Sequence, residues 1–311
     1  MIEVEKLSKV YGTTVAIRDL DFCVPTGEIW GFLGPNGAGK TTTMRILAGY
    51  LRATTGTARI VSYDVHRQSL QVRQRIGYLP ENPPLYLEMT VEGFLDFVAR
   101  IKGVVAGERG TRVNEVLKKC QLQEQRRVLI HKLSKGYRQR VGIAQALVHD
   151  PPVVILDEPT VGLDPQQIIE VRHLIKSLAG QHTVILSTHI LPEVSMTCSK
   201  ATIINRGCVV ATDIPTAPTI SSESCSYELE IQGDVNLILP RLQTIPHLTK
   251  LHSQNIPHTS RFSLHLKSES IPEIGADVAR IIVNSGLDLL EMRRTNPTLE
   301  DIFLAIINSE L

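Results

Sequence analysis

The sequence has few aromatic residues, few cysteines and almost no net charge. Aromatic side chains make up 5% of its 311 residues, and only one of them is tryptophan. The formal net charge is +1 at pH 7, so no global basic field argues for a nucleic-acid partner. Hydrophobic residues at 42% and charged residues at 21% are ordinary for a soluble globular chain that is long enough for two domains.

The cysteines are odd in number and widely scattered, at Cys23, Cys120, Cys198, Cys208 and Cys225. Neither a C-x-x-C pair nor a histidine spacing suited to zinc accompanies them, so we expect reduced cytosolic thiols. The N-terminus alternates apolar and charged residues and lacks the apolar run of a signal peptide. No run of about 18 apolar residues occurs, so we expect no bilayer-spanning segment and only a peripheral role at a membrane.

A glycine-rich stretch between an apolar run and an expected helix gives the strongest signal. Gly34, Gly39, Lys40 and Thr41 fit the pattern G-x-x-x-x-G-K-[ST]. In that pattern backbone N–H groups wrap phosphate oxygens, the lysine reaches the β- and γ-phosphates, and the hydroxyl binds Mg²⁺. Glycine allows the backbone to approach closely, and the dipole of the following helix favours an anion. An ordinary strand, turn and helix is the alternative.

Alternating apolar residues predict short strands ahead of this stretch, over 2–7, 14–17, 20–24 and 28–33. Tyr11 falls in a turn between the first two strands, where its ring can stack on a base or simply pack.

Beyond the glycine-rich stretch we expect a helix over 40–50, strands over 57–61 and 75–79, and helices over 91–102 and 109–120. Thr90 is a credible N-cap for the helix over 91–102. Because the two later helices lie between parts rich in strands, this block resembles an inserted subdomain.

Two further buried strands end in polar residues. The β-branched run over 153–156 predicts a strand buried on both faces, with Asp157 and Glu158 at its carboxyl end. Ligand sites of open α/β sheets lie at such ends, where one carboxylate suits Mg²⁺ and one suits polarising water. A strand over 183–187 brings His189 to the same edge. A solvated surface turn for the acids and a structural role for the histidine are the alternatives.

Two more helices flank the first of these strands. Ser134 opens a helix that runs to about residue 149, and a structural role as its N-cap is the alternative to a role in function. A further helix is expected over 166–179.

In order along the chain, these motifs resemble those of the ATP-binding cassette subunit of an ABC transporter. Within that family the chain is similar to the type that pairs with ABC-2 permeases in exporters, including those of gliding motility. The resemblance covers about residues 2–211. Its motifs are GPNGAGKTT (34–42) for Walker A, LSKGY (133–137) for the signature, VVILDEP (153–159) for Walker B, GLDP (162–165) for the D-loop and STH (187–189) for the switch.

The resemblance implies an α/β fold, that of a P-loop NTPase ABC cassette. Its parts would be a RecA-like core, an antiparallel β subdomain and a helical subdomain at about 82–150. ATP and Mg²⁺ are the implied cofactors.

The resemblance also implies roles for individual residues. Tyr11 would stack on adenine. Glu158 would be the general base, His189 would contact the γ-phosphate, and Lys40 and Glu81 would complete the catalytic set. Mg²⁺ would be held by Thr41, by Asp157 through water, and by Glu81. The phosphates would lie against Gly34, Pro35, Asn36, Gly37, Ala38, Gly39, Lys40, Thr41 and Thr42.

A dimer is implied as well, because in this family two cassettes sandwich two ATP molecules head to tail. Asp164 would couple the two sites across the interface, in a homodimer or with a paired cassette subunit. A helix that begins at Ser134 agrees, because its N-terminus is a second anion-binding end. The signature that completes the opposite subunit's site would be Leu133, Ser134, Lys135, Gly136 and Tyr137.

The chain departs from the family pattern in two motifs. Glu81 stands where glutamine is usual; a carboxylate can ligate metal or orient water but cannot donate as an amide does. Lys135 and Tyr137 replace the common glycine and glutamine of the signature, while Ser134 and Gly136 are kept.

The C-terminal part differs in character, which predicts an ABC ATP-binding domain over 1–215 and an accessory α+β domain over 216–311. A linker is expected over 212–226, followed by a β-α-β-β-α-β order that is typical of a ferredoxin-like domain. The expected elements are strands 227–231, 249–252, 261–266 and 288–293 and helices 236–243 and 271–285. A last helix, capped at Thr298, either packs or has a regulatory or dimerising role.

We therefore expect an ATPase subunit, on the cytoplasmic face of the inner or plasma membrane, that energises a separate ABC-2 permease. The apolar run over 83–87 would receive a permease helix, or else be ordinary core. The alternative function is a soluble cassette ATPase that acts on DNA or ribosomes. The chain has one cassette, no heptad run and no basic tail, which does not favour this alternative.

Overall fold

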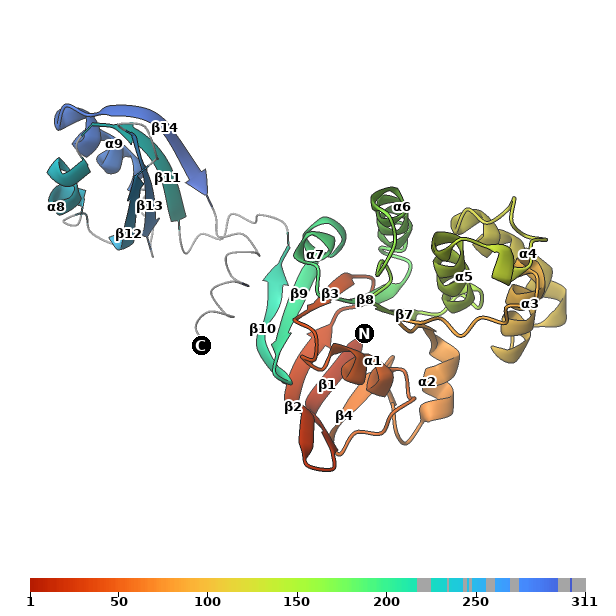
Figure 1. Ribbon diagram of the computed structural model, residues 1–311. Coiled ribbons are helices and arrows are strands. Elements are labelled where there is room, and N and C mark those ends of the chain that lie inside the picture. Colours follow the sequence, from red (N-terminus) through yellow and green to blue (C-terminus); the bar gives the residue numbers. More distant parts are fainter. Residues whose placement is uncertain are drawn as a thin grey trace. The chain divides into compact units, whose positions relative to one another are not determined.

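The computed structural model describes residues 1–216, 225–233, 235–242, 245, 248–255, 261–268, 274–295 and 303. The chain divides into two compact units, Met1–Ala217 with Ala305–Leu311, and Pro218–Leu304. Figure 1 shows the elements of both units in sequence colours.

The first unit contains a six-stranded sheet with the order β10-β9-β3-β8-β7-β6 (Figure 1). All neighbouring strands from β9 to β6 are parallel, and only the edge strand β10 runs antiparallel to its neighbour. Every residue of β3, β7 and β8 is buried, as apolar runs in a sheet covered on both faces require. The bounds are β3 Ile29–Leu33, β6 Ile76–Leu79, β7 Val153–Asp157, β8 Thr183–Thr188, β9 Lys200–Asn205 and β10 Cys208–Pro215.

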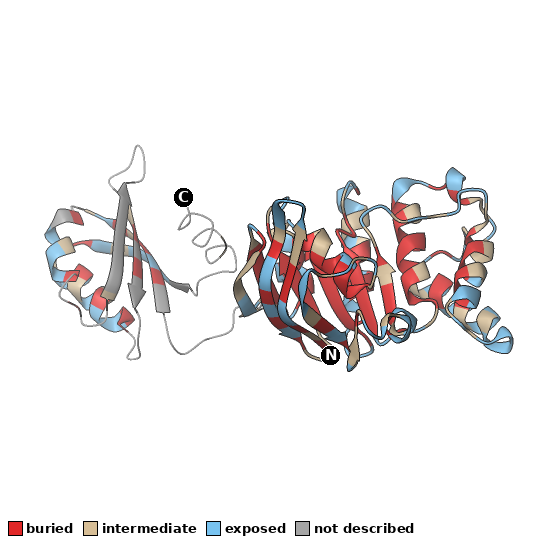
Figure 2. Ribbon diagram, turned by 90° about the horizontal axis from the view of Figure 1, so that it is seen from below, coloured by how far each residue is buried: buried red, intermediate tan, exposed pale blue. Residues whose placement is uncertain are grey.

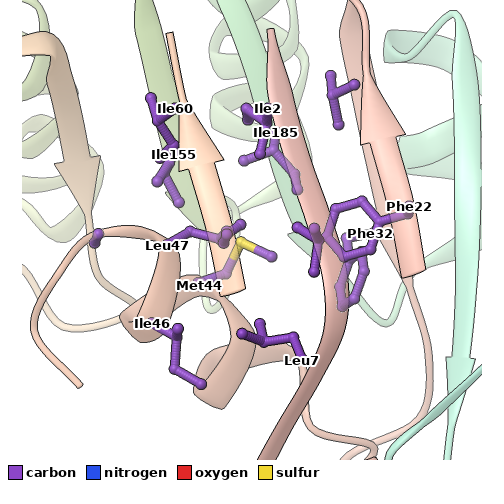
Figure 3. Close-up of a cluster of buried hydrophobic side chains, with 14 of the residues drawn as sticks. Ile2, Leu7, Phe22, Phe32, Met44, Ile46, Leu47, Ile60, Ile155 and Ile185 are labelled. Atoms are coloured by element: carbon purple, nitrogen blue, oxygen red, sulfur yellow. The ribbon is translucent and has the colours of Figure 1, made fainter. Parts of the chain in front are cut away.

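A second, antiparallel sheet of the same unit has the order β2-β1-β4-β5. Its strands are β1 Ile2–Tyr11, β2 Thr14–Val24, β4 Thr55–Ile60 and β5 Tyr63–Asp64. Apolar side chains from this sheet, from the six-stranded sheet and from helix α1 (Lys40–Leu47) form one hydrophobic cluster (Figure 3). Buried residues lie along the strands of both sheets of the first unit (Figure 2). This cluster fixes α1, and with it the glycine-rich loop, against the parallel sheet.

The remaining helices of the first unit are α2 Ser69–Arg75, α3 Val91–Ile101, α4 Ala106–Lys119, η1 Ile130–Lys132, α5 Lys135–Leu147, α6 Pro165–Lys176 and α7 Leu191–Thr197. Helices α3, α4 and α5 pack against one another between β6 and β7 in the chain (Figure 1). Thr90 caps α3, with its hydroxyl accepting from the Gly93 N–H, as predicted. In the part of the chain that the structure describes, no helix combines the length and apolarity that a membrane crossing needs.

Helix α5 and strand β6 approach at backbone distance. A Cβ built on Gly77 would lie 2.0 Å from the carbonyl oxygen of Ala146. Gln145 of α5 and His149, just beyond its C-terminal end, also reach β6. Gln145 Nε2 donates to the Tyr78 carbonyl at 2.8 Å, and His149 Nε2 lies 3.0 Å from the Ile76 carbonyl. The glycine is therefore required by close packing of the helix on the strand.

The second unit is a four-stranded antiparallel sheet with the order β12-β13-β11-β14. Along the chain its elements alternate as β-α-β-β-α-β. The bounds are β11 Cys225–Gln232, η2 Val235–Leu237, α8 Leu239–Leu242, β12 Leu248–Asn255, β13 Arg261–Ser268, α9 Gly275–Asn284 and β14 Asp288–Thr295. Leu229, Leu264, Val278 and Ile282 belong to its buried apolar cluster, so α9 packs on one face of the sheet.

Several expected elements differ from the structure. The expected linker over 212–226 is wrong at both ends, because β10 continues to Pro215 and β11 begins at Cys225. The two strands expected over 14–17 and 20–24 are one strand, in which Asp19 takes a left-handed φ of 43°. Helices α2 and α7 were not expected. The predicted helix capped at Thr298 lies outside the described residues, apart from Phe303.

Replacing Gly77 by alanine should destabilise the first unit. The added methyl would overlap backbone atoms of α5, which cannot move aside as a flexible side chain could. We expect a loss of about 1–3 kcal/mol in the free energy of unfolding, measured by urea denaturation followed by circular dichroism.

Gly110→Ala in α4 is the matched control, because nothing lies within 4 Å of a Cβ built there. In a helix interior this change should stabilise by about 0.5–1 kcal/mol. Equal stability of the Gly77→Ala variant and the wild type would contradict the close packing of α5 on β6.

Candidate active site

The candidate site lies where three neighbouring parallel strands end. Leu33 of β3 pairs with Thr188 of β8, and Asp157 of β7 pairs with Ser187 of β8. The residues that follow these strands therefore leave the sheet at one level. This places the glycine-rich loop, Glu158 and His189 at the same edge, which is where open α/β sheets bind ligands.

The glycine-rich loop depends on glycine at specific positions. Gly37 and Gly39 have φ angles of 80° and 104°, which side chains other than hydrogen rarely allow. A Cβ on Gly34 would lie 2.2 Å from the Ile204 carbonyl oxygen, and one on Gly39 would lie 2.5 Å from Ile17 Cγ2. The loop thus follows a path close to β2 and β9, and α1 begins directly after it at Lys40.

Lys40 folds back over the loop. Its Nζ donates to the carbonyl oxygens of Gly34 at 2.8 Å and Pro35 at 3.1 Å. The same atom lies 3.4 Å from Glu158 Oε1, and both side chains are nearly buried. The ammonium is therefore held between the loop and the carboxylate that follows β7.

Glu158 has a left-handed backbone, with φ of 50°, which is uncommon for a residue with a long side chain. Its N–H donates to the Ser187 carbonyl at 3.1 Å, which ties the turn to β8. His189 Nδ1 lies 3.0 Å from Oε2 and 3.1 Å from Oε1 of Glu158. Because a carboxylate only accepts, Nδ1 carries the proton in this contact. The carboxylate thus faces Lys40 on one side and His189 on the other.

Asp157 is completely buried, and only one of its two carboxylate oxygens has hydrogen-bond partners among the described residues. Its Oδ1 accepts from Thr41 Oγ1 at 3.3 Å and from the Ser187 hydroxyl. Among the described residues, no hydrogen-bond partner reaches its buried Oδ2. Burial raises the pKa of Asp157 above its usual range, the two hydroxyl hydrogen bonds oppose this, and the charges of Glu158 and Glu81 add to it. A divalent cation would supply the missing partner and favour the charged form.

A cleft of about 430 Å³ opens over these groups. Its lining contains Asn36, Gly37, Gly39, Lys40, Thr41, Thr42, Glu81, Glu158 and His189, all predicted, together with Ala16 and Val161. Sequence reasoning missed the last two because no motif includes them; Ala16 is adjacent to the loop only through folding of β2. The oxygen ligands of Thr41 and Asp157 fit Mg²⁺, which prefers hard oxygen donors.

Tyr11 does not line this cleft. The residue is 47% exposed, and Lys9 Nζ lies over its ring, 5.1 Å from the ring centroid. An exposed ring is compatible both with stacking on a base and with simple packing.

The signature and Asp164 lie at a different cavity, of about 460 Å³, whose lining includes Gly136, Tyr137, Asp164 and Gln167. Gly136 is buried there, and a Cβ on it would lie 2.4 Å from the Gln167 side chain. Leu133 is buried, and Lys135 lies against the backbone of Gly162.

Asp164, which lines this second cavity, and Ser134, two residues before Gly136, are helix caps. Ser134 accepts from the Tyr137 N–H at 3.4 Å at the start of α5, and Asp164 accepts from the Gln167 N–H at 2.9 Å at the start of α6. The N-cap role expected of Ser134 is therefore present. One chain does not bring the signature into the cleft that holds Lys40 and Glu158.

Comparison with known proteins agrees with the motifs. The ABC transporter family model matches residues 17–161. The bacitracin transport ATP-binding protein BcrA of Bacillus licheniformis is 33% identical over 311 residues, which cover 99% of this chain and 97% of that protein. The Nod factor export ATP-binding protein I of Paraburkholderia xenovorans is 32% identical, covering 100% and 98%.

The fold matches solved structures over about two thirds of the chain. A dimeric bacterial ABC transporter cassette superposes with a TM-score of 0.62 at 26% identity, covering 68% of this chain and 97% of that one. Full-length similarity to ATP-binding transport subunits, the cassette fold and the clustered Walker residues lead to one conclusion: the chain belongs to the ABC transporter family, as an ATP-binding cassette protein that hydrolyses ATP.

Proposed function

We propose that this chain is the ATPase subunit of an exporter and acts with a separate ABC-2 type permease at the cytoplasmic face of a membrane. The observation that carries the proposal is its full-length similarity to subunits named for bacitracin transport and for Nod factor export. The chain has its own ATP-hydrolysing cassette but, among the described residues, no helix suited to cross a membrane. A transport path would then come from another chain.

In the proposed reaction, Glu158 takes a proton from the water that attacks the γ-phosphate. The carboxylate is suited to this role because it is buried, held in a fixed turn and already close to His189 and Lys40. Lys40 would exchange its loop carbonyls for phosphate oxygens, and His189 would contact the γ-phosphate. Mg²⁺, when bound at Thr41 and Asp157, would neutralise phosphate charge.

We also propose that two cassettes form the working unit. The cleft over Lys40 contains no signature residue, and Gly136 and Tyr137 of the signature line another cavity of the same chain. The dimeric state of the similar bacterial cassette supports a head-to-tail pair, in which Ser134 and Gly136 complete the partner's site and Asp164 couples the two. The α5 N-terminus would then face the γ-phosphate.

Glu81 would act at the metal or orient water. Its side chain is exposed and lines the cleft with Glu158, and its charge raises the pKa of Asp157. A third carboxylate would strengthen the demand of the site for a divalent cation.

The permease would dock on exposed apolar side chains of the helical block. Tyr86 is 54% and Leu87 45% exposed, so the alternative that this run is ordinary core is wrong for these two residues. The Tyr86 ring lies 5.4 Å from that of Phe97, and Ile101, one helical turn later, is 66% exposed. A stripe of this kind, next to Glu81 in the chain, fits an apolar permease helix and places it close to the cleft.

Replacing Glu158 by glutamine should stop turnover while nucleotide binding persists. Glutamine keeps the shape of the side chain but cannot take a proton from water. We expect the ATPase rate, measured by phosphate release, to fall by about 10²–10⁴-fold. ATP should then trap a dimer, detected by size-exclusion chromatography with light scattering.

Glu115→Gln is the matched control, since this exposed carboxylate lies on α4 outside both cavities. It should leave the ATPase rate unchanged. Wild-type turnover in Glu158→Gln would remove Glu158 as the base.

A Tyr86→Ser/Leu87→Ser double variant should lose its membrane partner. These changes remove two exposed apolar contacts from the proposed docking stripe, and we expect affinity for the permease to fall by about tenfold or more. The measurement is co-purification of a multi-span membrane protein, identified by mass spectrometry, from detergent extracts. ATP hydrolysis by the isolated variant should be unchanged.

Leu70→Ser, at a 60% exposed position of α2, controls for the loss of surface apolarity. Equal capture of the permease by the double variant would contradict the docking surface. Nuclease-sensitive sedimentation of the wild type with ribosomes or DNA would contradict the transport role.

For the region from 216 to 311 we propose an accessory domain that ATP binding does not need. The cleft-lining residues all precede residue 190. A chain ending at residue 215 should therefore bind a fluorescent ATP analogue with unchanged affinity. A chain ending at residue 304 lacks only residues 305–311, which group with the first unit. Loss of binding in both shortened chains would assign the effect to that closing stretch. Loss of binding in either shortened chain would contradict the proposal, and loss in the shorter chain alone would place the required residues within 216–304.

A further inference from the structure

Glu193 is a buried carboxylate that no motif of the chain contains. It lies in the first turn of α7 and is 1% exposed. A charge this deeply buried is costly unless hydrogen bonds compensate it. Its contacts therefore show which parts of the fold depend on it.

Two buried hydroxyls donate to this carboxylate. Thr160 Oγ1 donates to Oε1, and Thr188 Oγ1 donates to Oε2 at 2.7 Å. Thr160 comes two residues after Glu158, and Thr188 is the residue before His189. One carboxylate thus joins the turn after β7 to the end of β8.

The Thr188 hydroxyl has a second partner, which fixes its direction. It accepts from the Ile190 N–H at 3.0 Å, and its only proton goes to Glu193. The backbone on both sides of His189 is therefore tied through Thr188 to the carboxylate. The Glu193 N–H in turn donates to the Ile190 carbonyl at 3.1 Å, which closes the start of α7 on the same turn.

The contact between Glu158 and His189 spans the same two turns. Glu158 is in a left-handed conformation that its surroundings must hold, and the imidazole lies 3.0 Å from its carboxylate. Without the bridge through Glu193, the two turns would still be joined at the Glu158 N–H by its bonds to Ser187. The turn beyond Glu158, which includes Thr160, would lose its fixed position relative to His189.

We propose that Glu193 is a positioning residue for ATP hydrolysis, which holds the Glu158 carboxylate and the His189 imidazole in register by bridging Thr160 and Thr188. It does not touch the cleft, whose lining does not include it. The inference rests on the proposed role of Glu158 as the base. It extends the hydrolytic site by one layer, from the residues of the motifs to the residue that orients them.

The test is Glu193→Ala, assayed as the full chain. We expect kcat for ATP to fall about tenfold or more, because small misplacements of reacting groups are costly to the rate. KM, and the affinity for a fluorescent ATP analogue, should be unchanged, because Lys40 and the glycine-rich loop are not touched. A structural defect alone would lower binding along with kcat.

Glu193→Gln should restore much of the rate. Its amide oxygen still accepts from one threonine, and its N–H can donate to the other hydroxyl. Thr160→Val and Thr188→Val should each lower kcat, and each should add little in the Glu193→Ala background, because the bridge is already lost. These two variants also decide the question if Glu193→Ala fails to fold.

Thr202→Val is the matched control. This buried hydroxyl accepts from Trp30 Nε1 at 2.9 Å and lies outside the cleft, so its loss should lower thermal stability but not kcat. A normal kcat in Glu193→Ala, or a loss that only follows thermal stability as in Thr202→Val, would overturn the proposal.

Glu158→Gln measured alongside separates the two claims. Full turnover in that variant contradicts the base, whatever Glu193 does. A stalled Glu158→Gln with a normal Glu193→Ala contradicts the positioning role alone.

Discussion

The site depends on the register of three parallel strands. Because β3, β8 and β7 pair so that Leu33 meets Thr188 and Asp157 meets Ser187, the chain leaves the sheet three times at one level. Each exit contributes one part of the chemistry: a glycine-rich loop, two carboxylates, or a histidine. Slipping one strand would separate these groups, so the apolar pairing that builds the core also sets the distances at the site.

The charges gathered at this edge are buried to an extent that does not favour stability. Lys40 and Glu158 are both nearly buried, and Asp157 is fully buried with one oxygen lacking a partner among the described residues. Buried ion pairs seldom repay the cost of removing both charges from water. The arrangement is understandable as preparation of a site for phosphate and a cation, whose charges complete what the protein leaves half satisfied.

The sequence could predict those parts of the fold in which residue types are tied to one backbone geometry. Gly34 and Gly39 are such cases, since neighbouring atoms leave no room for a side chain, and the apolar runs of β7 and β8 fit only a strand buried on both faces. The edge strand β10 could not be recognised, because its residues are half-buried or exposed and include threonine, aspartate and proline. Glu193 gave no local signal either, since Thr160 lies 33 residues away in the sequence and the STH motif that contains Thr188 does not extend to a carboxylate five residues later.

The close contact of α5 with β6 links the cleft over Lys40 to the cavity lined by Gly136 and Tyr137. Helix α5 begins at the signature, beside the second cavity, and β6 leads into Glu81 at the cleft. Backbone contact at Gly77 and the bond from Gln145 to Tyr78 leave these elements little freedom to slide on each other. Gly142 of the same helix, where a Cβ would lie 3.0 Å from Pro83, extends the contact beyond Glu81. A displacement of the segment between Glu81 and the exposed Tyr86 would therefore be passed to α5, and so to the signature, by packing rather than by a flexible loop.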